Sequence, residues 1–207
     1  MIAKRGFDFV SSLLGLLILA PLFGLIALWI KLESPGPVFF RQERVGLQGR
    51  LFRIHKFRTM RVAVETQGPQ ITIGADPRIT RAGAFLRKHK LDELAQLIDV
   101  LSGRMSLVGP RPEVPRYIGC YPGEVRAKVL SVRPGITDWA SLHFKEESTL
   151  LAAAREPERA YIEQVLPIKQ KYYLEYVERR SFSGDIKILV STVTALFGRS
   201  RLPSTAR

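Results

Sequence analysis

The chain has 207 residues and carries 32 Lys or Arg against 19 Asp or Glu, a formal net charge of +13. This length allows one modest domain plus an appendage, and the charge predicts an anionic partner: nucleic acid, a phospholipid surface or a phosphorylated small molecule. The single cysteine, Cys120, excludes an internal disulfide and is expected to be a small packing residue, and no Cys/His cluster has the spacing of a zinc site.

The first predicted element is an uncharged run over residues 9–30, which as a straight helix would be about 33 Å long, enough to cross a bilayer. Pro21 interrupts this run and predicts a kink. Basic residues flank both ends, so the positive-inside rule gives no reason for either end to cross. We therefore expect a re-entrant membrane helix that enters and leaves on the cytoplasmic side. A single membrane span is the alternative.

A Ser-Pro-Gly-Pro sequence at residues 34–37 is expected to end this helix. It divides a membrane segment, residues 1–35, from a larger domain on the cytoplasmic side, residues 36–200. A basic tail over residues 201–207 is expected to fray and to be attracted to anionic lipid.

Two β-prone runs, residues 38–42 and 51–56, are joined by a connection that contains two glycines and predict a hairpin. Near the end of the second run, Lys56 and Arg58 are candidates to project from a strand end into a site, although such residues are more commonly solvated surface charges. His55 is interpreted as an ordinary strand residue.

Two adjacent carboxylates, Asp92 and Glu93, lie at the start of an apolar-periodic run that ends at residues 102–103. The period predicts a helix with both carboxylates in its first turn, where exposed N–H groups and the helix dipole favour anions. An ionised carboxylate held there could act as a nucleophile or a metal ligand. Acidic residues in a first turn are also ordinary helix-start chemistry, so the spacing alone does not choose between these interpretations.

Basic residues, Arg87 among them, crowd the sequence before the acidic pair. A cationic wall beside two carboxylates suits a phosphate-bearing substrate and a bridging divalent ion. Further along, Pro110 and Pro112 stiffen the backbone on either side of Arg111, so its guanidinium would lose little freedom on binding a phosphate. Arg133, which is followed by a proline and a glycine, is a second arginine on a backbone stiffened by proline.

The C-terminal part predicts an amphipathic helical region over residues 156–181, whose apolar side is expected to pack in the core. A following apolar helix over residues 186–197 is too short to span a bilayer and is expected to lie in the headgroup layer. Together these elements predict a mixed α and β fold, mainly helical, with a small β-hairpin, a re-entrant N-terminal helix and interfacial amphipathic helices.

Four motifs follow one another along the chain: KFRTM at residues 56–60, LDEL at 91–94, SLVGPRP at 106–112 and RPGIT at 133–137. In this order they resemble the signature of the bacterial sugar transferases, a resemblance that runs from the first residue to about residue 190. These are small monotopic membrane enzymes, polyprenyl-phosphate phosphoglycosyl transferases, which move a sugar phosphate from a nucleoside diphosphate sugar to a polyprenyl phosphate.

The resemblance implies that Asp92 is the nucleophile, through an aspartyl phosphosugar, and the magnesium-associated carboxylate, with Glu93 as its dyad partner. It implies that Lys56, Arg87 and Arg111 are basic site residues. Arg111 and its flanking prolines would lie at the nucleotide and diphosphate. The motifs also place Arg58 and Arg133 among the substrate-binding residues.

The same resemblance implies a UDP-sugar donor, undecaprenyl phosphate as acceptor and magnesium (Mg2+) as cofactor. It places residues 36–200, as the catalytic domain, at the cytoplasmic face of the bacterial inner membrane, among inner-membrane lipid. The reaction would be the first membrane step in the assembly of a polysaccharide or glycoprotein glycan. A homodimer is compatible with the sequence but is not predicted by any motif.

Two departures from the family pattern limit what is transferred. Arg104 stands where relatives commonly carry an acidic residue, and residues 138–148 replace the commoner continuation after RPGIT, so no sugar is assigned. Direct transfer in a ternary complex is an alternative mechanism, and a non-catalytic basic membrane adaptor is an alternative function. No nucleic acid is expected, because the basic residues form no recognised nucleic-acid module and no aromatic stacking platform.

Overall fold

The computed structural model describes residues 2–62, 76–144 and 147–196. The predicted basic tail, residues 201–207, lies outside the described residues. The described fold is mainly helical with a small antiparallel sheet, which confirms the predicted fold class at that level.

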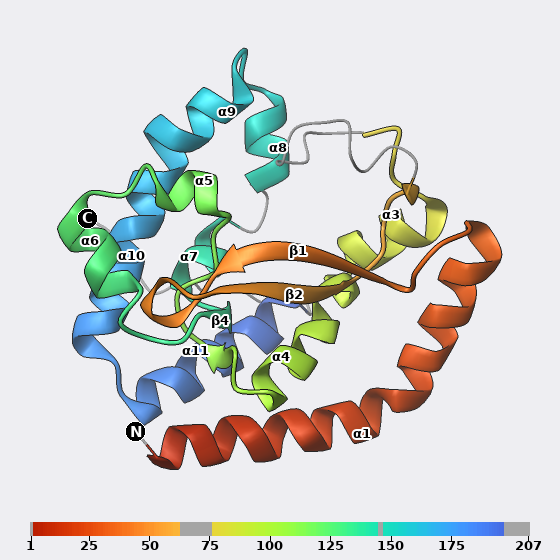
Figure 1. Ribbon diagram of the computed structural model, residues 1–207, viewed down its shortest axis with the longest axis horizontal. Helices are drawn as coiled ribbons and strands as arrows, with labels where there is room; N and C mark the ends of the chain where they lie inside the picture. The colour runs from red at the N-terminus through yellow and green to blue at the C-terminus, as the bar shows by residue number, and fades with distance from the viewer. Residues whose placement is uncertain (1, 63–75, 145–146, 197–207) are drawn as a thin grey trace.

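Helix α1 (Ile2–Glu33) contains Pro21 and is bent: in Figure 1 its first half runs along the base of the molecule and its second half rises toward the hairpin. A proline removes one helical hydrogen bond and accounts for such a bend. Among the described helices α1 is the one long and apolar enough to cross a membrane. Apolar side chains such as Ile18 (75% exposed) and Leu32 (78% exposed) face outward, so α1 is not a buried core helix.

Polar bonds fix both ends of α1 to the rest of the molecule. Near its start, the Asp8 carboxylate accepts a hydrogen bond from Ser106 Oγ at 2.8 Å. At its end, the Glu33 carboxylate accepts bonds from the first two N–H groups of helix α3 (Arg81–Lys88), at 2.6 and 2.8 Å. These N–H groups have no partner within their own helix, so Glu33 caps α3. Both ends of the apolar helix therefore contact the same domain.

The predicted hairpin is present. Strands β1 (Phe39–Val45) and β2 (Leu51–Phe57) pair in antiparallel fashion, with Phe40 opposite Lys56, and the short helix η1 (Leu47–Gly49) forms the turn. Both strands extend slightly beyond the predicted bounds.

The acidic pair lies where α3 gives way to the next helical stretch. The sequence predicts one helix from residue 91 to residues 102–103. The structure instead begins with a 3₁₀ helix, η2 (Leu91–Gln96), followed by α4 (Leu97–Leu101). Lys90, in the left-handed conformation with φ 56°, turns the chain between α3 and η2. The tighter 3₁₀ turns leave both carboxylates at the start of the element, as predicted.

A second, very small sheet was not predicted. Strands β3 (Ser106–Val108) and β4 (Gly135–Thr137) run parallel, so the SLVGPRP and RPGIT motifs lie side by side. The backbones meet so closely that a Cβ at Gly135 would lie 2.1 Å from the Gly109 nitrogen. Only glycine leaves room for this approach.

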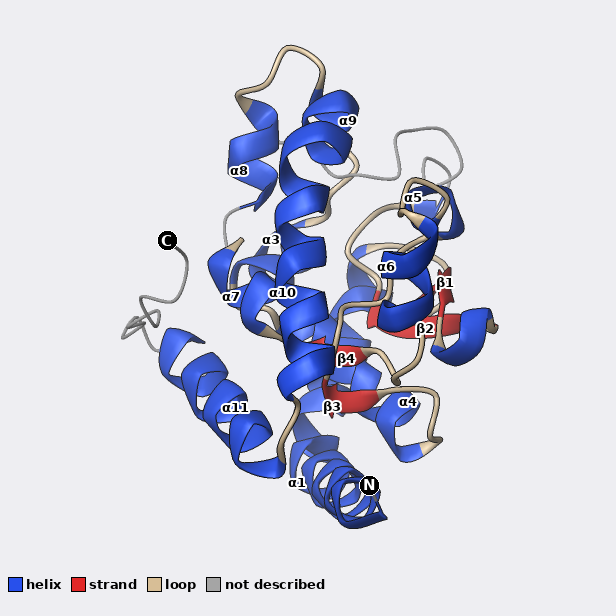
Figure 2. Cartoon of the chain, turned by 90° about the vertical axis from the view of Figure 1, so that its left-hand side faces the viewer, coloured by secondary structure: helices blue, strands red, loops and turns tan. Residues whose placement is uncertain are grey.

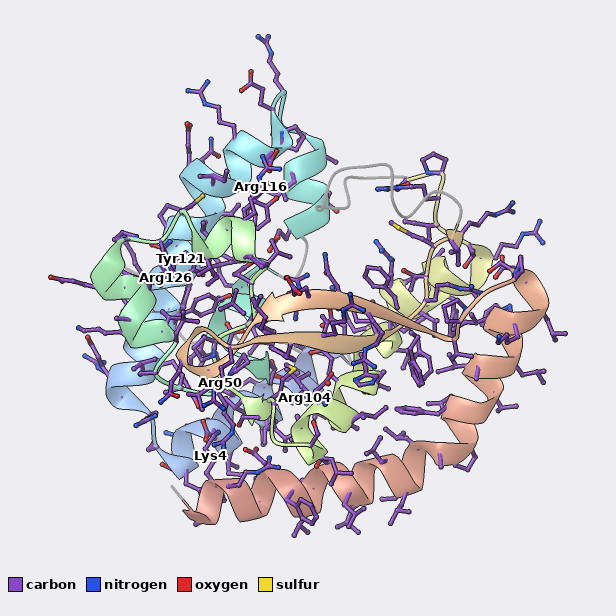
Figure 3. The ribbon with its side chains drawn as sticks, viewed as in Figure 1. Lys4, Arg50, Arg104, Arg116, Tyr121 and Arg126 are labelled. Carbon is purple, nitrogen blue, oxygen red and sulfur yellow. The ribbon has the colours of Figure 1, made fainter. Side chains whose placement is uncertain are left out.

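The main core packs the C-terminal helices around buried tyrosines, including Tyr161 and Tyr173, which confirms the predicted core role of this region. Figure 2 shows α10 upright in the middle of the molecule, with α11 near α1. Lys4, labelled at the start of α1 in Figure 3, contacts Asp185 of α11.

Cys120, expected to be a packing residue, is exposed, so that prediction is wrong. The helices of this half are α5 (Pro115–Ile118), α6 (Gly123–Val129), α7 (Trp139–His143), α8 (Glu147–Ala152), α9 (Pro157–Ala160), the π-helix η3 (Tyr161–Val165), α10 (Leu166–Arg179) and α11 (Phe182–Leu196).

Candidate active site

The Glu93 carboxylate is held by two cations. Arg111 donates to it from both terminal nitrogens, Nη1 at 2.9 Å, and Lys56 Nζ donates at 2.8 Å. The Glu93 side chain is 20% exposed. Burial raises the pKa of the Glu93 carboxyl, but Arg111 and Lys56 outweigh it and hold the pKa well below its usual value. Glu93 is therefore an ionised carboxylate whose lone pairs are largely occupied.

Its neighbour Asp92 is in a different state. Asp92 is 9% exposed, and its carboxylate accepts no hydrogen bond from the described residues. Burial, and then the negative charge of Glu93, raise the pKa of Asp92, while Lys56 and Arg87 oppose the rise. Asp92 thus has cations nearby but free lone pairs, as a nucleophile or metal ligand requires.

Helix α3 contributes the third cation. Arg87 Nε donates to Thr59 Oγ1 at 2.8 Å. Burial lowers the pKa of Arg87, and the charge of Asp92 opposes this effect. Helix α3, which carries Arg87, packs against η2, which carries Asp92. The burial of Lys56 likewise lowers its pKa, and Glu93 opposes it.

The structure thus brings together five of the predicted side chains, and Pro110 and Pro112 flank one of them. These side chains come from β2, from the neighbouring elements α3 and η2, and from the segment after β3. The five are Asp92, Glu93, Lys56, Arg87 and Arg111.

Arg58 lies elsewhere. Its side chain is buried, and its guanidinium donates to the carbonyls of Ser34 and Pro35, both at 2.7 Å, and to Ser34 Oγ at 3.0 Å. Carbonyls at the end of a helix lack helical partners and attract cations, so Arg58 stabilises the end of α1 instead of projecting into the acidic site. The prediction that it reaches a site from the strand end is corrected by this placement.

Arg133 also lies outside the cluster. Its Nε donates to the Gly103 carbonyl at 3.0 Å, just after α4. No bond joins Arg133 to the acidic pair among the described residues. It fixes the turn between α4 and β3.

Sequence reasoning missed two charged residues near the site. Asp99 is fully buried; it accepts the His55 main-chain N–H and pairs with His55 Nδ1, both at 2.8 Å, and Arg104 lies 3.8 Å away. Arg104, which stands where relatives commonly carry an acidic residue, thus pairs with Asp99. Arg44, the second, donates to the Pro112 carbonyl at 3.0 Å. Neither residue stands in a spacing that distinguishes it from surface charge.

Asp92 is the residue best placed to contact a metal ion. The described residues contain no group of three His, Cys, Asp or Glu side chains that could hold one without help. Mg2+ commonly takes one or two carboxylates together with substrate phosphates and water, so a single free carboxylate beside several cationic side chains fits the donor set of this ion.

A free carboxylate, an ion-paired carboxylate and several cations define a site suited to chemistry on a phosphate-bearing substrate. A family model described as bacterial sugar transferase matches residues 1–199. The chain therefore belongs to the bacterial sugar transferase family, which confirms the resemblance seen in the four motifs.

Three relatives illustrate the similarity to known proteins. The chain is 40% identical over 197 residues to a UDP-glucose:undecaprenyl-phosphate glucose-1-phosphate transferase of Escherichia coli strain K12. This alignment covers 92% of this chain and 39% of that protein. It is 44% identical over 141 residues to a UDP-N-acetylgalactosamine-undecaprenyl-phosphate N-acetylgalactosaminephosphotransferase of Aeromonas hydrophila, 67% of this chain and 33% of that protein.

The third relative is of similar length. The exopolysaccharide production protein PSS of Rhizobium leguminosarum bv. phaseoli is 38% identical over 210 residues, 97% of this chain and 98% of that protein. The chain thus spans about two fifths of the length of the E. coli relative, and nearly the whole of the Rhizobium protein.

Proposed function

We propose that this chain transfers a sugar 1-phosphate from a UDP-sugar to undecaprenyl phosphate and releases UMP. The observation that carries the proposal is the contrast within the acidic pair: Glu93 is occupied by Arg111 and Lys56, whereas Asp92 accepts no hydrogen bond from the described residues. An adaptor that binds anionic lipid through charge alone has no use for such a pair. The family and the names of the relatives support the same reaction class.

In the proposed first step, a carboxylate oxygen of Asp92 attacks the β-phosphorus of the donor, and the bond from this phosphorus to the bridging oxygen breaks. UMP leaves with that electron pair, and an aspartyl phosphosugar remains. In the second step, a phosphate oxygen of the lipid attacks the same phosphorus and restores the Asp92 carboxylate. Arg111 and Arg87 would neutralise charge on the phosphates, and Glu93 would keep Lys56 and Arg111 oriented.

Magnesium is part of the proposal. Asp92 and the donor phosphates would hold it, and when bound it supplies positive charge to the phosphate oxygens. The sugar is left open, because the relatives' names include both glucose and N-acetylgalactosamine.

The proposed membrane arrangement is a re-entrant α1 on the cytoplasmic face of the inner membrane. In support, Asp8 near its start and Glu33 at its end contact the same domain. A spanning helix would separate these ends by about 30 Å of hydrocarbon and break one set of contacts. Exposed Phe182, Val190 and Val193 on α11 support an interfacial position for that helix, and Phe182 touches Phe7 of α1.

The test is incubation of the purified protein with UDP-sugars and magnesium, without lipid acceptor. A covalent intermediate requires UMP in an amount close to one per enzyme, and a phosphosugar mass on the peptide that carries Asp92. Asp92→Asn should abolish both signals. Glu124→Gln, which changes an exposed acid on α6, is the control and should retain them. UMP release that strictly requires undecaprenyl phosphate, with no adduct, would show direct transfer in a ternary complex. If no UDP-sugar yields UMP, even with undecaprenyl phosphate present, the proposed reaction is wrong and the non-catalytic membrane adaptor is the function that remains.

A further inference from the structure

The segment over residues 109–113 carries Arg111 but has few N–H groups to hold it, because Pro110 and Pro112 have none. It is held mainly through its carbonyls. The Gly135 N–H donates to the Pro110 carbonyl at 2.9 Å, and the Val45 N–H donates to the Glu113 carbonyl at 2.9 Å. Of the two carbonyls between them, that of Pro112 accepts its hydrogen bond from a side chain.

That side chain is Arg44 of β1, whose Nη1 donates to the Pro112 carbonyl at 3.0 Å. Among the described residues, no other side chain bonds to the main chain of residues 109–113. Pro112 is buried, so its carbonyl cannot exchange this partner for bulk water without a shift of the segment.

Arg44 is itself fixed in place. Its side chain is 15% exposed, its Nη2 donates to Gln42 Oε1 at 2.6 Å, and its Nη1 lies 3.9 Å from Glu113 Oε2. Glu113 is in turn buried and accepts a hydrogen bond from the Tyr161 hydroxyl at 2.7 Å. Tyr161 begins the π-helix η3, an uncommon element that is frequent at functional sites.

Arg44 lies near the acidic site but does not bond to it. Burial lowers the pKa of Arg44, Glu113 opposes this effect and the charge of Arg111 adds to it, so the two guanidinium groups interact. Each guanidinium has its own set of contacts: Arg44 bonds to Pro112 and Gln42, and Arg111 bonds to Glu93.

We propose that Arg44 is a positioning residue: by holding the Pro112 carbonyl, it sets the direction in which Arg111 presents its planar fork to Glu93 and to the donor diphosphate. This inference rests on the proposed role of Arg111 at the donor. A misplacement of about 1 Å in a binding group can cost about a hundredfold in rate, so loss of this one bond should be visible in catalysis.

The experiment compares Arg44→Met, which removes the donor and the charge, with Arg44→Lys, which keeps the charge and one donor. Arg41→Met is the matched control, since Arg41 lies on the same strand and is exposed, and within the described part of the chain its side chain donates only to the Arg53 carbonyl. Donor kinetics are measured at a temperature where all variants are equally folded. We expect the KM for the UDP-sugar to rise about tenfold to a hundredfold in Arg44→Met, to return part of the way in Arg44→Lys, and to stay unchanged in Arg41→Met.

A second measurement does not depend on activity. The side-chain nitrogen resonances of Arg111 in ¹⁵N-labelled protein report whether its fork on Glu93 is ordered, and they should broaden or shift in Arg44→Met. An unchanged KM in Arg44→Met would overturn the proposal. A raised KM with unaltered Arg111 resonances would also overturn it, because Arg44 would then contact the donor itself. If Arg44→Met does not fold, Arg44→Lys carries both measurements.

The same pair of readouts separates this inference from the proposed function. A wild-type protein that releases no UMP from any donor would refute the reaction. The Arg111 resonances would then decide by themselves whether Arg44 orders the fork.

Discussion

Substitutions within the acidic pair should change stability in opposite directions. Glu93→Gln removes the negative charge that pairs with Arg111 and Lys56, so two largely buried cations lose the carboxylate to which they bond. Breaking a buried ion pair by removing one partner costs about 3–5 kcal/mol, and the remaining amide oxygen of Gln places the expected loss at about 3 kcal/mol. For a chain of this size that loss lowers Tm by about 6–12 °C.

Asp92→Asn should instead stabilise the fold. Its carboxylate is buried beside Glu93 and accepts no hydrogen bond among the described residues, so its ionised form is unfavourable in the folded state. Removing this charge should add about 0.5–2 kcal/mol, the usual gain when a functional residue held at a cost to stability is replaced. Activity should be abolished in the same variant.

The pH dependence follows from the two pKa shifts. The raised pKa of Asp92 means that its ionisation costs stability as pH rises through the folded-state pKa, so the advantage of Asp92→Asn should be present at pH 7.5 and vanish near pH 4. The lowered pKa of Glu93 means that its contribution is full above its unfolded pKa of about 4.3 and is lost as pH falls through the folded pKa. The deficit of Glu93→Gln should therefore persist at pH 7.5 and shrink only in stronger acid.

The assay is thermal unfolding in lipid nanodiscs, followed by tryptophan fluorescence at several pH values. Glu124→Gln, at an exposed position in α6, is the control and should change stability by less than about 0.5 kcal/mol. The reasoning is refuted if Asp92→Asn lowers Tm at pH 7.5, or if Glu93→Gln does not.

Three further predictions concern the donor, the membrane helix and the small parallel sheet. Arg111→Lys keeps the charge but loses the planar fork onto Glu93, so kcat/KM for the donor should fall about tenfold or more; wild-type donor kinetics would refute this role. Cysteines introduced at positions 2 and 40 should both react only with a label applied from the cytoplasmic side, and periplasmic labelling of position 2 in the otherwise unchanged protein would exclude a re-entrant helix. Pro21→Leu should shift α1 toward a membrane-spanning arrangement. Gly135→Ala places a Cβ 2.1 Å from the Gly109 nitrogen and should lower the free energy of unfolding, measured in urea, by about 3 kcal/mol. The control Gly123→Ala, with no atom within 4 Å of the new Cβ, should be tolerated. Equal stability of the two variants would contradict the close approach of the two backbones.

The sequence by itself determined the elements whose signals are local. The uncharged run and Pro21 predicted a long helix with a bend, the β-prone runs predicted the hairpin, and apolar spacing placed Asp92 and Glu93 in a first turn. Four ordered motifs identified the family, which the family model confirms. Each of these signals depends on residues close together in the chain, so no tertiary contact is needed to find them.

Tertiary structure alone decided which charges meet. Arg58 and Lys56 lie two positions apart, yet Lys56 bonds to Glu93 while Arg58 turns to the end of α1. Arg44 had no distinguishing pattern, because its partner is a main-chain carbonyl 68 positions away. Spacing also could not separate Asp92 from Glu93. In the folded chain Arg111, placed after β3 where β3 pairs with β4, and Lys56 both bond to Glu93, whereas Asp92 accepts no hydrogen bond from the described residues. The state of each carboxylate therefore depends on its neighbours in space.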